Sequence, residues 1–280
     1  MPDDAPEMKR RAVGRGLRRG GATGDNSSML GATSLPHLSV VVPCYNGADR
    51  LPAALAQLSS WLEAQPYDAE LILVDDCSGP DAAEVLRAFA SGRPGVTLLR
   101  NDPNGGKGVS VGRGLRAARA PYRVFTDADL AYPPSEINRI LRDLEAGNGV
   151  AIACRVLPES RYEMSPSFFH YLYTRHIMSR VFNALVRFVL LRDVLDTQAG
   201  LKGFTAAAVE QVFPLVTIPR FGFDVEALFI AQKKGFTVKQ TAVHFRYDEE
   251  PTSVSFAQSA FVMAGEVLQV RINDWRGRYD

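Results

Sequence analysis

Short apolar runs alternate with amphipathic stretches along most of this chain. Apolar runs that end in polar turns are typical of strands buried on both faces of a sheet. Stretches with apolar residues at helical spacing follow these runs and predict helices between the strands. The expected strands cover residues 38–43, 70–74, 96–99 and 149–153 and the run that leads into residue 127. The expected helices cover residues 51–64, 81–90 and 109–119, a stretch after residue 134, and residues 176–191, 221–234 and 255–272.

This alternation predicts the fold class, which is an α/β domain with a Rossmann-like, mostly parallel sheet and helices on both faces. We place the domain at residues 37–280, with a nucleotide-binding half over residues 37–153 and an acceptor-side half over residues 154–280. Apolar and polar residues alternate over residues 237–247, which predicts a β-hairpin or an edge strand. Residues 1–36 lack a periodic apolar pattern, and we expect a disordered basic tail there.

Composition and charge describe an ordinary globular protein. The chain is 46% hydrophobic and 22% charged, and its formal net charge of +1 argues against a nucleic-acid partner. Its scattered cysteines, Cys44, Cys77 and Cys154, predict reduced thiols in a cytoplasmic protein. No apolar run of about 20 residues is visible, so we expect any membrane contact to be peripheral. The basic tail is either solvated or attracted to anionic lipid.

Two aspartates, Asp127 and Asp129, follow the fourth expected strand. Residues i and i+2 of a strand point the same way, so both carboxylates face one point if the strand geometry continues. Their mutual repulsion calls for a cation between them, and oxygen ligands of this kind suit Mg²⁺ or Mn²⁺. An Asp-x-Asp pair also arises by chance in a chain of this length, so the pair alone is a weak signal.

Polar residues also follow the first two strands, at the edge where α/β sheets bind ligands. Tyr45 and Asn46 follow the first strand, and Asp75 and Asp76 follow the second. Together with the aspartate pair after the fourth strand, these positions favour one common site.

Lys107 lies in a glycine-rich loop before the third expected helix. The loop lacks the spacing of a Walker A motif, and the turn after the first strand lacks the Gly-x-Gly-x-x-Gly of dinucleotide-binding folds. Binding of a redox cofactor is therefore not expected. Lys107 either reaches a phosphate near the helix N-terminus or is a solvated loop lysine.

Four ordered motifs resemble those of inverting family 2 glycosyltransferases, whose fold is called GT-A. They are Val-Val-Pro-Cys-Tyr-Asn at 41–46, Val-Asp-Asp-Cys-Ser at 74–78, Asn-Gly-Gly-Lys-Gly at 104–108 and Asp-Ala-Asp at 127–129. The resemblance implies that Asp129, with help from Asp127, holds a divalent metal on a diphosphate. The residues implied to hold the nucleotide sugar are Pro43, Tyr45, Asn46, Asp75, Asp76 and Lys107.

Residues 196–204 resemble the Asp-Thr-Gln-x-Gly-x-Lys-x-Phe stretch of the dolichyl-phosphate glucosyltransferase branch. The similar dolichyl-phosphate mannose synthases usually carry arginine where Lys202 stands and a glutamine metal ligand where Ala131 stands. The resemblance implies that Lys202 is catalytic together with Asp127 and Asp129, because it would meet the charge that develops on the departing diphosphate. The alternative for Lys202 is a surface lysine after a tight turn.

The expected helix over residues 176–191 has one apolar face and one basic face. It either packs against the domain or lies in a lipid interface. The resemblance implies that Arg155, Arg175 and Ser179 bind an acceptor phosphate. Arginine suits this role because its planar group pairs bidentately with phosphate oxygens.

The resemblance implies an inverting enzyme that moves a hexose, with glucose from UDP-glucose favoured, to a polyprenyl or dolichyl phosphate at the cytoplasmic face of a membrane. One alternative is a transferase acting on a sugar hydroxyl of a glycolipid or polysaccharide. Such an acceptor needs a general base, for which Asp224 and Glu226 are candidates, although a helix N-terminus alone also favours acids there. A second alternative is a GDP-mannose-dependent polyprenyl-phosphate mannosyltransferase, and a third is a nucleotide-sugar binding protein without activity.

Overall fold

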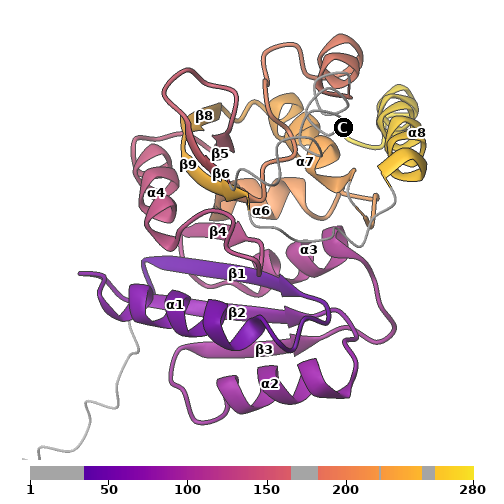
Figure 1. Cartoon of the computed structure of the whole chain (residues 1–280). Coiled ribbons are helices and arrows are strands. Elements are labelled where there is room, and N and C mark those ends of the chain that lie inside the picture. Colours follow the sequence, from indigo (N-terminus) through magenta and orange to yellow (C-terminus); the bar gives the residue numbers. More distant parts are fainter. Residues whose placement is uncertain (1–34, 165–181, 221, 248–255) are drawn as a thin grey trace, which may run out of the picture. The chain divides into compact units, whose positions relative to one another are not determined.

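The computed structural model describes residues 35–164, 182–220, 222–247 and 256–280 (Figure 1). Leu35–Asp280 form one compact unit. The tail expected over residues 1–36 lies outside the described residues except for its last two positions. The helix expected over residues 176–191 is described from residue 182 onward, and residues 182–189 are helical.

Seven strands form one sheet in the order β3-β2-β1-β4-β7-β5-β8. The pairs β1-β2, β1-β4, β2-β3 and β5-β8 are parallel, and β7 runs antiparallel to both of its neighbours. The predicted α/β class with a mostly parallel sheet is confirmed. The strands are β1 (Leu38–Cys44), β2 (Ala69–Asp75), β3 (Val96–Arg100), β4 (Tyr122–Thr126), β5 (Val150–Cys154), β7 (Leu201–Thr205) and β8 (Val238–Ala242).

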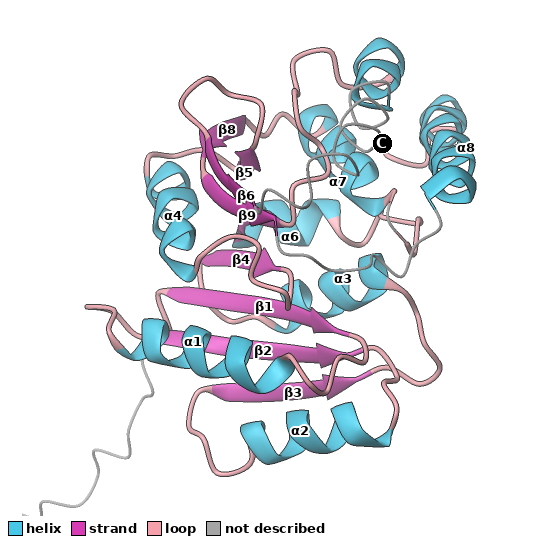
Figure 2. Cartoon of the chain, in the orientation of Figure 1, coloured by secondary structure: helices cyan, strands magenta, loops and turns pink. Residues whose placement is uncertain are grey.

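Helices cover both faces of the sheet (Figure 2). Successive side chains of a strand point to opposite faces, so Val40 and Val42 of β1 join one apolar core and Val41 joins the other. The core that contains Val40 is covered by α1 (Leu51–Glu63), α2 (Pro80–Ala90) and α4 (Ile137–Glu145). The core that contains Val41 is covered by α3 (Lys107–Ala117), α6 (Ala206–Val212) and α7 (Phe223–Lys233). Both layers shield the sheet from water, as a parallel sheet requires.

Within the seven-stranded sheet, the strand that the sequence pattern did not predict is β7. It lies between β4 and β5, with Lys202 opposite Phe125 of β4 and Ile152 of β5. Gly203 permits close packing against α4, because a β-carbon there would come within 2.5 Å of the Ile140 side chain. The insertion of β7 places a lysine inside the sheet, beside the strand that leads to the aspartate pair.

Residues 237–247 provide an edge strand, and the alternative of a hairpin is wrong. β8 forms the edge of the large sheet, whereas β9 (His244–Tyr247) pairs in parallel with β6 (Arg161–Met164) in a separate two-stranded sheet. At the junction, Val243 bonds to a distant segment. Its carbonyl accepts the Arg161 N–H at 2.9 Å, and its N–H donates to the Ser160 hydroxyl at 3.1 Å. These bonds turn the chain out of the first sheet before a hairpin can form.

The remaining helical segments are η1 (Pro134–Glu136) and α8 (Phe256–Trp275). α8 confirms the helix predicted near the end of the chain. Of the helices in the described part of the chain, none combines the length and the apolar character needed to cross a bilayer.

Candidate active site

The carboxyl ends of β1, β2 and β4 meet at one edge of the sheet, because these strands are parallel neighbours. Hydrogen bonds tie the loops after β1 and β2 together. The Asn46 N–H donates to the Ser78 hydroxyl at 2.9 Å, and the Gly79 N–H donates to the Asn46 side-chain oxygen at 3.0 Å. The Ser78 N–H donates to Asp75 at 2.8 Å. Asn46 and Asp75, both predicted nucleotide contacts, therefore belong to one loop cluster.

Asp75 is buried at the end of β2 and pairs with Arg100 of β3. Arg100 also donates to the Ser78 carbonyl at 3.1 Å, so it holds the same loop from the other side. The sequence analysis missed Arg100, for which the only local signal was an arginine at the end of the third strand. Pro43 is half-buried within β1 and Tyr45 is exposed just beyond it, so their nucleotide contacts stay predictions.

Asp76 shapes the loop that carries Lys107. Its carboxylate accepts the N–H groups of Gly105 and Gly106 at 2.9 and 2.8 Å and the Asn101 amide at 2.7 Å. Burial alone would raise the pKa of Asp76, but these hydrogen bonds outweigh burial and lower the pKa below its usual value. Gly106 has a φ of 89°, which glycine adopts without strain. Asp76 therefore builds the loop that presents Lys107 at the N-terminus of α3.

Lys107 and Asp127 form an ion pair with an N–O distance of 2.7 Å. Burial alone would lower the pKa of Lys107, but the charges of Asp127, Asp224 and Asp129 together raise it above its usual value. Asp129 is exposed beyond this pair, and its carboxylate accepts the Ala131 N–H at 3.0 Å. Lys107 therefore lies beside both aspartates and is not a solvated loop lysine.

Lys202 and Asp224 form a second, deeper ion pair of 2.7 Å, with side chains only 1% and 5% exposed. Lys202 also donates to the Ala199 carbonyl, and its ammonium nitrogen lies 5.4 Å from the centre of the Phe125 ring. Burial lowers the pKa of Lys202 and raises the pKa of Asp224. The alternative of a surface lysine at position 202 is wrong. Its contact with a diphosphate stays a prediction, because its ammonium is bound to protein groups here.

The two ion pairs form one electrostatic unit, which we call the charge cluster. Asp224 helps to raise the pKa of Lys107, and Lys107 in turn opposes the rise in the pKa of Asp224. When all its members are ionised, the cluster has one net negative charge, which favours a bound cation. The members are Lys107, Asp127, Asp129, Lys202 and Asp224.

The donor chemistry of Asp127 and Asp129 fits a hard divalent cation. In the part of the chain that the structure describes, no group of three or more histidine, cysteine or acidic side chains is placed to hold a metal. Mg²⁺ commonly uses one or two carboxylates and completes its shell with water and substrate phosphates. Gly200 leaves room for the Asp127 carboxylate itself, because a β-carbon at position 200 would stand 2.0 Å from a carboxylate oxygen. The two aspartates therefore fit a metal that arrives with a phosphate ligand.

Arg155, predicted to bind the acceptor phosphate, is held by Asp196. Its guanidinium donates to both carboxylate oxygens, at 2.7 and 2.8 Å, and its N–H donates to one of them at 3.0 Å. Asp196 is 1% exposed, and the sequence analysis gave it no partner. Arg175 and Ser179, the other predicted phosphate ligands, lie outside the described residues. The pair orients Arg155, and phosphate binding stays a prediction.

Glu226, one candidate for the acceptor side, is fully buried in α7. It accepts hydrogen bonds from the N–H groups of Thr217 and Ile218 at 2.8 and 2.7 Å, from the Thr217 hydroxyl at 2.7 Å and from the Tyr279 hydroxyl at 2.6 Å. These contacts join α7 to the preceding loop and to the end of the chain, which favours a structural role. Asp224, two residues earlier on the chain, is the acid of this helix that belongs to the charge cluster.

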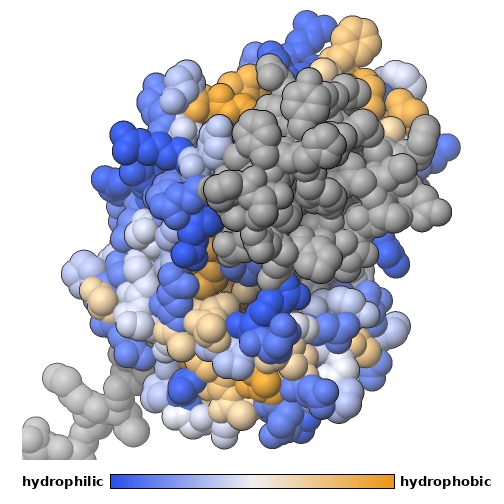
Figure 3. Space-filling view, in the orientation of Figure 1, coloured by the Kyte–Doolittle hydropathy of each residue, from blue (hydrophilic) through white to orange (hydrophobic). Residues whose placement is uncertain are grey.

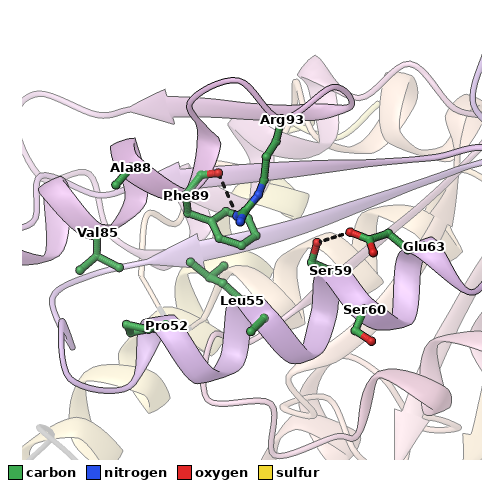
Figure 4. A pocket seen from close by; sticks show the side chains of 10 residues that line it. Pro52, Leu55, Ser59, Ser60, Glu63, Val85, Ala88, Phe89 and Arg93 are labelled. Atoms are coloured by element: carbon green, nitrogen blue, oxygen red, sulfur yellow. Dashed lines mark hydrogen bonds between the residues drawn. The ribbon is translucent and has the colours of Figure 1, made fainter.

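A separate hollow of about 580 Å³ lies between α1 and α2 (Figure 4). Its lining includes Leu55, Val85 and Phe89, and the Arg93 guanidinium lies 4.1 Å from the centre of the Phe89 ring. Apolar atoms also reach the surface in this region in Figure 3. None of the predicted nucleotide-binding residues lines the hollow, so it is distinct from the candidate site.

The fold matches that of solved transferase structures. Glucosyl-3-phosphoglycerate synthase from Mycobacterium tuberculosis, in complex with Mn²⁺, UDP-glucose and phosphoglyceric acid, has a TM-score of 0.62 at 18% identity. That comparison covers 84% of this chain and 79% of the synthase. The mannosyltransferase PcManGT from Pyrobaculum calidifontis, in complex with GDP-mannose and Mn²⁺, has a TM-score of 0.55 at 17% identity over 87% of this chain and 65% of that one. The fold is GT-A.

Sequence relatives define the family. Residues 39–213 match the model of glycosyl transferase family 2. Dolichyl-phosphate beta-glucosyltransferase of Dictyostelium discoideum is 30% identical over 248 residues, which are 84% of this chain and 74% of the relative. The Homo sapiens protein of the same name is 30% identical over 86% of this chain and 77% of the relative. The chain belongs to glycosyl transferase family 2.

We expect Gly200→Ala to weaken metal binding. The added methyl group would displace the Asp127 carboxylate, so the affinity for Mn²⁺ measured by electron paramagnetic resonance in the presence of UDP should fall about tenfold, the order seen when the surroundings of a metal ligand are disturbed. Gly265→Ala on α8 is the control, because a β-carbon there meets no described atom within 4 Å. Unchanged Mn²⁺ affinity in Gly200→Ala would remove Asp127 from the metal site.

We expect Asp196→Asn to destabilise the fold at neutral pH by about 3 kcal/mol, because it removes one charge of a buried pair. Burial alone would raise the pKa of Asp196, but the charge and hydrogen bonds of Arg155 lower it. The stability that the Asp196 carboxylate contributes to the wild type is therefore fully present above the unfolded pKa of about 3.9. It is lost as the pH falls from there through the lower pKa of the folded state.

Urea unfolding of the Asp196→Asn variant and the wild type at pH 7 and at pH 3 measures this difference. The exposed Asp81→Asn on α2 is the control and should lie within about 0.5 kcal/mol of the wild type at both values. A difference for Asp196→Asn that is equally large at pH 3 would contradict the role of the carboxylate charge.

Proposed function

We propose that this protein transfers glucose from UDP-glucose to a polyprenyl phosphate, with inversion at the anomeric carbon. The observation that carries the proposal is the charge cluster at the carboxyl edge of the sheet, in a chain 30% identical to dolichyl-phosphate beta-glucosyltransferases. Its aspartates offer oxygen ligands for a cation, and its lysines offer positive charge for the phosphates that such a cation accompanies.

On the donor side, Asp127 and Asp129 would hold Mg²⁺ or Mn²⁺, which when bound offsets the charge of the diphosphate. Lys107 is the more accessible ammonium of the cluster, with 19% of its side chain exposed, and it lies at a helix N-terminus. Both features suit contact with phosphate oxygens. Lys202 is buried against Asp224, so in this conformation its charge supports the site through the field and not through direct contact.

On the acceptor side, a phosphate oxygen would attack the anomeric carbon on the face opposite the diphosphate. The bond from that carbon to the diphosphate oxygen breaks as the new bond forms. A phosphate monoester is largely dianionic near neutral pH, since its second pKa is about 6. Such an acceptor needs alignment more than a strong base. Arg155, held in place by Asp196, and the predicted ligands Arg175 and Ser179 would supply that alignment.

A sugar-hydroxyl acceptor is the second candidate, and the raised pKa of Asp224 favours it. A carboxylate that is reluctant to ionise is the better proton acceptor for a hydroxyl nucleophile. GDP-mannose is an alternative donor, and nucleotide-sugar binding without turnover is the non-enzyme alternative. We propose peripheral association with the cytoplasmic face of a membrane, where a polyprenyl phosphate would be presented.

The full-length protein should form glucosyl phosphoryl polyprenol from UDP-glucose and polyprenyl phosphate in detergent with Mg²⁺ or Mn²⁺. Mass spectrometry and a panel of UDP- and GDP-sugars identify the donor. Asp129→Ala should reduce turnover at least about a thousandfold while circular dichroism and melting stay like those of the wild type. The exposed Asp81→Ala is the matched control. Transfer only to sugar hydroxyls would reject the lipid-phosphate acceptor, and full activity of Asp129→Ala would reject the metal site.

A further inference from the structure

The outward face of α8 carries three exposed apolar side chains. Leu268, Ile272 and Trp275 are exposed by 54%, 36% and 77%, and their spacing of four and three residues places them on one side of the helix. The inward side carries Val267 and Val270, which are buried in the core beside α7. α8 therefore carries large apolar side chains toward the core and also on its exposed side.

A further exposed apolar residue lies on the helix that contacts α8 through Arg271. Phe188, at the end of the helix over residues 182–189, is 85% exposed. The side chain of Arg271 on α8 donates to the Val189 carbonyl at 2.6 Å, which joins the end of that helix to α8. Figure 3 shows apolar atoms at the surface on the upper right, where Figure 1 places α8. We call Phe188, Leu268, Ile272 and Trp275 together the α8 surface.

The charges around the α8 surface are mostly positive. Both carboxylates of α8 are turned to other partners. Asp274 pairs with Lys233 at 2.8 Å and with Arg271 at 3.2 Å, and Glu266 packs against Gly222. Exposed basic residues stand at the ends of the two helices, and besides Asp274 the acids among the described residues of these ends are the exposed Asp193 and the Lys233-paired Asp280. These basic residues are Arg187, Arg192, Arg276 and Arg278.

We propose that the α8 surface docks this protein on an anionic lipid bilayer. Apolar side chains with a tryptophan at the helix end and arginines at the rim match a helix that lies in the plane of the interface, with its apolar face among the acyl chains and its arginines at lipid phosphates. A second copy of the chain fits less well, because a two-fold interface pairs this surface with itself and would bring two basic rims together. The inference needs no step of the proposed reaction, and it is tested without nucleotide sugar or acceptor.

Trp275 itself can report on the docking. The chain has two tryptophans, Trp61 and Trp275, so full-length Trp61→Phe leaves one fluorophore at the α8 surface. With vesicles of phosphatidylcholine that contain about 30% of the anionic lipid phosphatidylglycerol, the emission should shift to the blue and be quenched by lipids brominated along the acyl chain. Emission that vesicles leave unchanged would overturn the proposal.

Co-sedimentation with the same vesicles measures the contribution of the surface. The triple variant Leu268→Gln, Ile272→Gln, Trp275→Gln should lower the partition coefficient about tenfold or more, and Tyr162→Gln, at an exposed aromatic on β6, should leave it unchanged. Melting curves check that the triple variant is folded. If it is not, the single variant Trp275→Gln replaces it, with a smaller expected loss of binding.

Equal binding of the folded variants and the wild type would assign lipid binding to another segment. A blue shift that follows protein concentration without vesicles, together with dimers in sedimentation equilibrium, would assign the surface to a second copy.

Discussion

The antiparallel insertion of β7 between β4 and β5 is the constraint on which the site depends. Because β7 runs against β4, the residues that precede it arrive at the edge where β4 ends, with Leu201 opposite Thr126. The Gly200 carbonyl accepts the Asp127 N–H at 3.1 Å, and Asp196 at the start of the same turn binds Arg155 after β5. One short segment therefore fixes the ends of two strands and sets Lys202 behind them.

The cost of this arrangement is a lysine inside the sheet. An ammonium group withdrawn from water is strongly disfavoured unless an opposite charge and hydrogen bonds compensate it. Asp224 on α7 and the Ala199 carbonyl supply that compensation for Lys202. Replacing such a pair by apolar residues often leaves stability unchanged or improves it, so stability alone does not explain why the charges are here. We propose that these charges, behind Asp127 and Lys107, set the field in which a charged ligand binds.

The sequence was sufficient for the elements with a clear apolar period. The apolar runs of β1, β2 and β5, the amphipathic α1 and α2 and the largely buried α7 lie within a few residues of their expected bounds, because their apolar residues are buried in the core. β7 escaped prediction because this five-residue strand contains a charged residue, Lys202, and has a glycine, Gly203, at its centre. Its burial depends on a partner, Asp224, that is close only in the folded chain.

For the site, the motifs identified which residues matter but not how they pair. Lys107 with Asp127, Arg100 with Asp75 and Arg155 with Asp196 are contacts between segments separated by loops and whole helices. No local period encodes such pairs, and only the strand order brings them together. Glu226 shows the converse, because a helix-start acid close to Asp224 in sequence is used to hold Thr217 and Tyr279.

The central claim is that the charge cluster and the loops after β1 and β2 form one site for a metal-bound nucleotide diphosphate. A crystal structure of the full-length protein with UDP and Mn²⁺ tests it most directly. The account predicts a Mn²⁺ ion about 2.0–2.3 Å from a carboxylate oxygen of Asp129 and bridged to the diphosphate, with the Lys107 ammonium on a phosphate oxygen. A nucleotide bound in the hollow between α1 and α2, with the charge cluster unchanged, would contradict it.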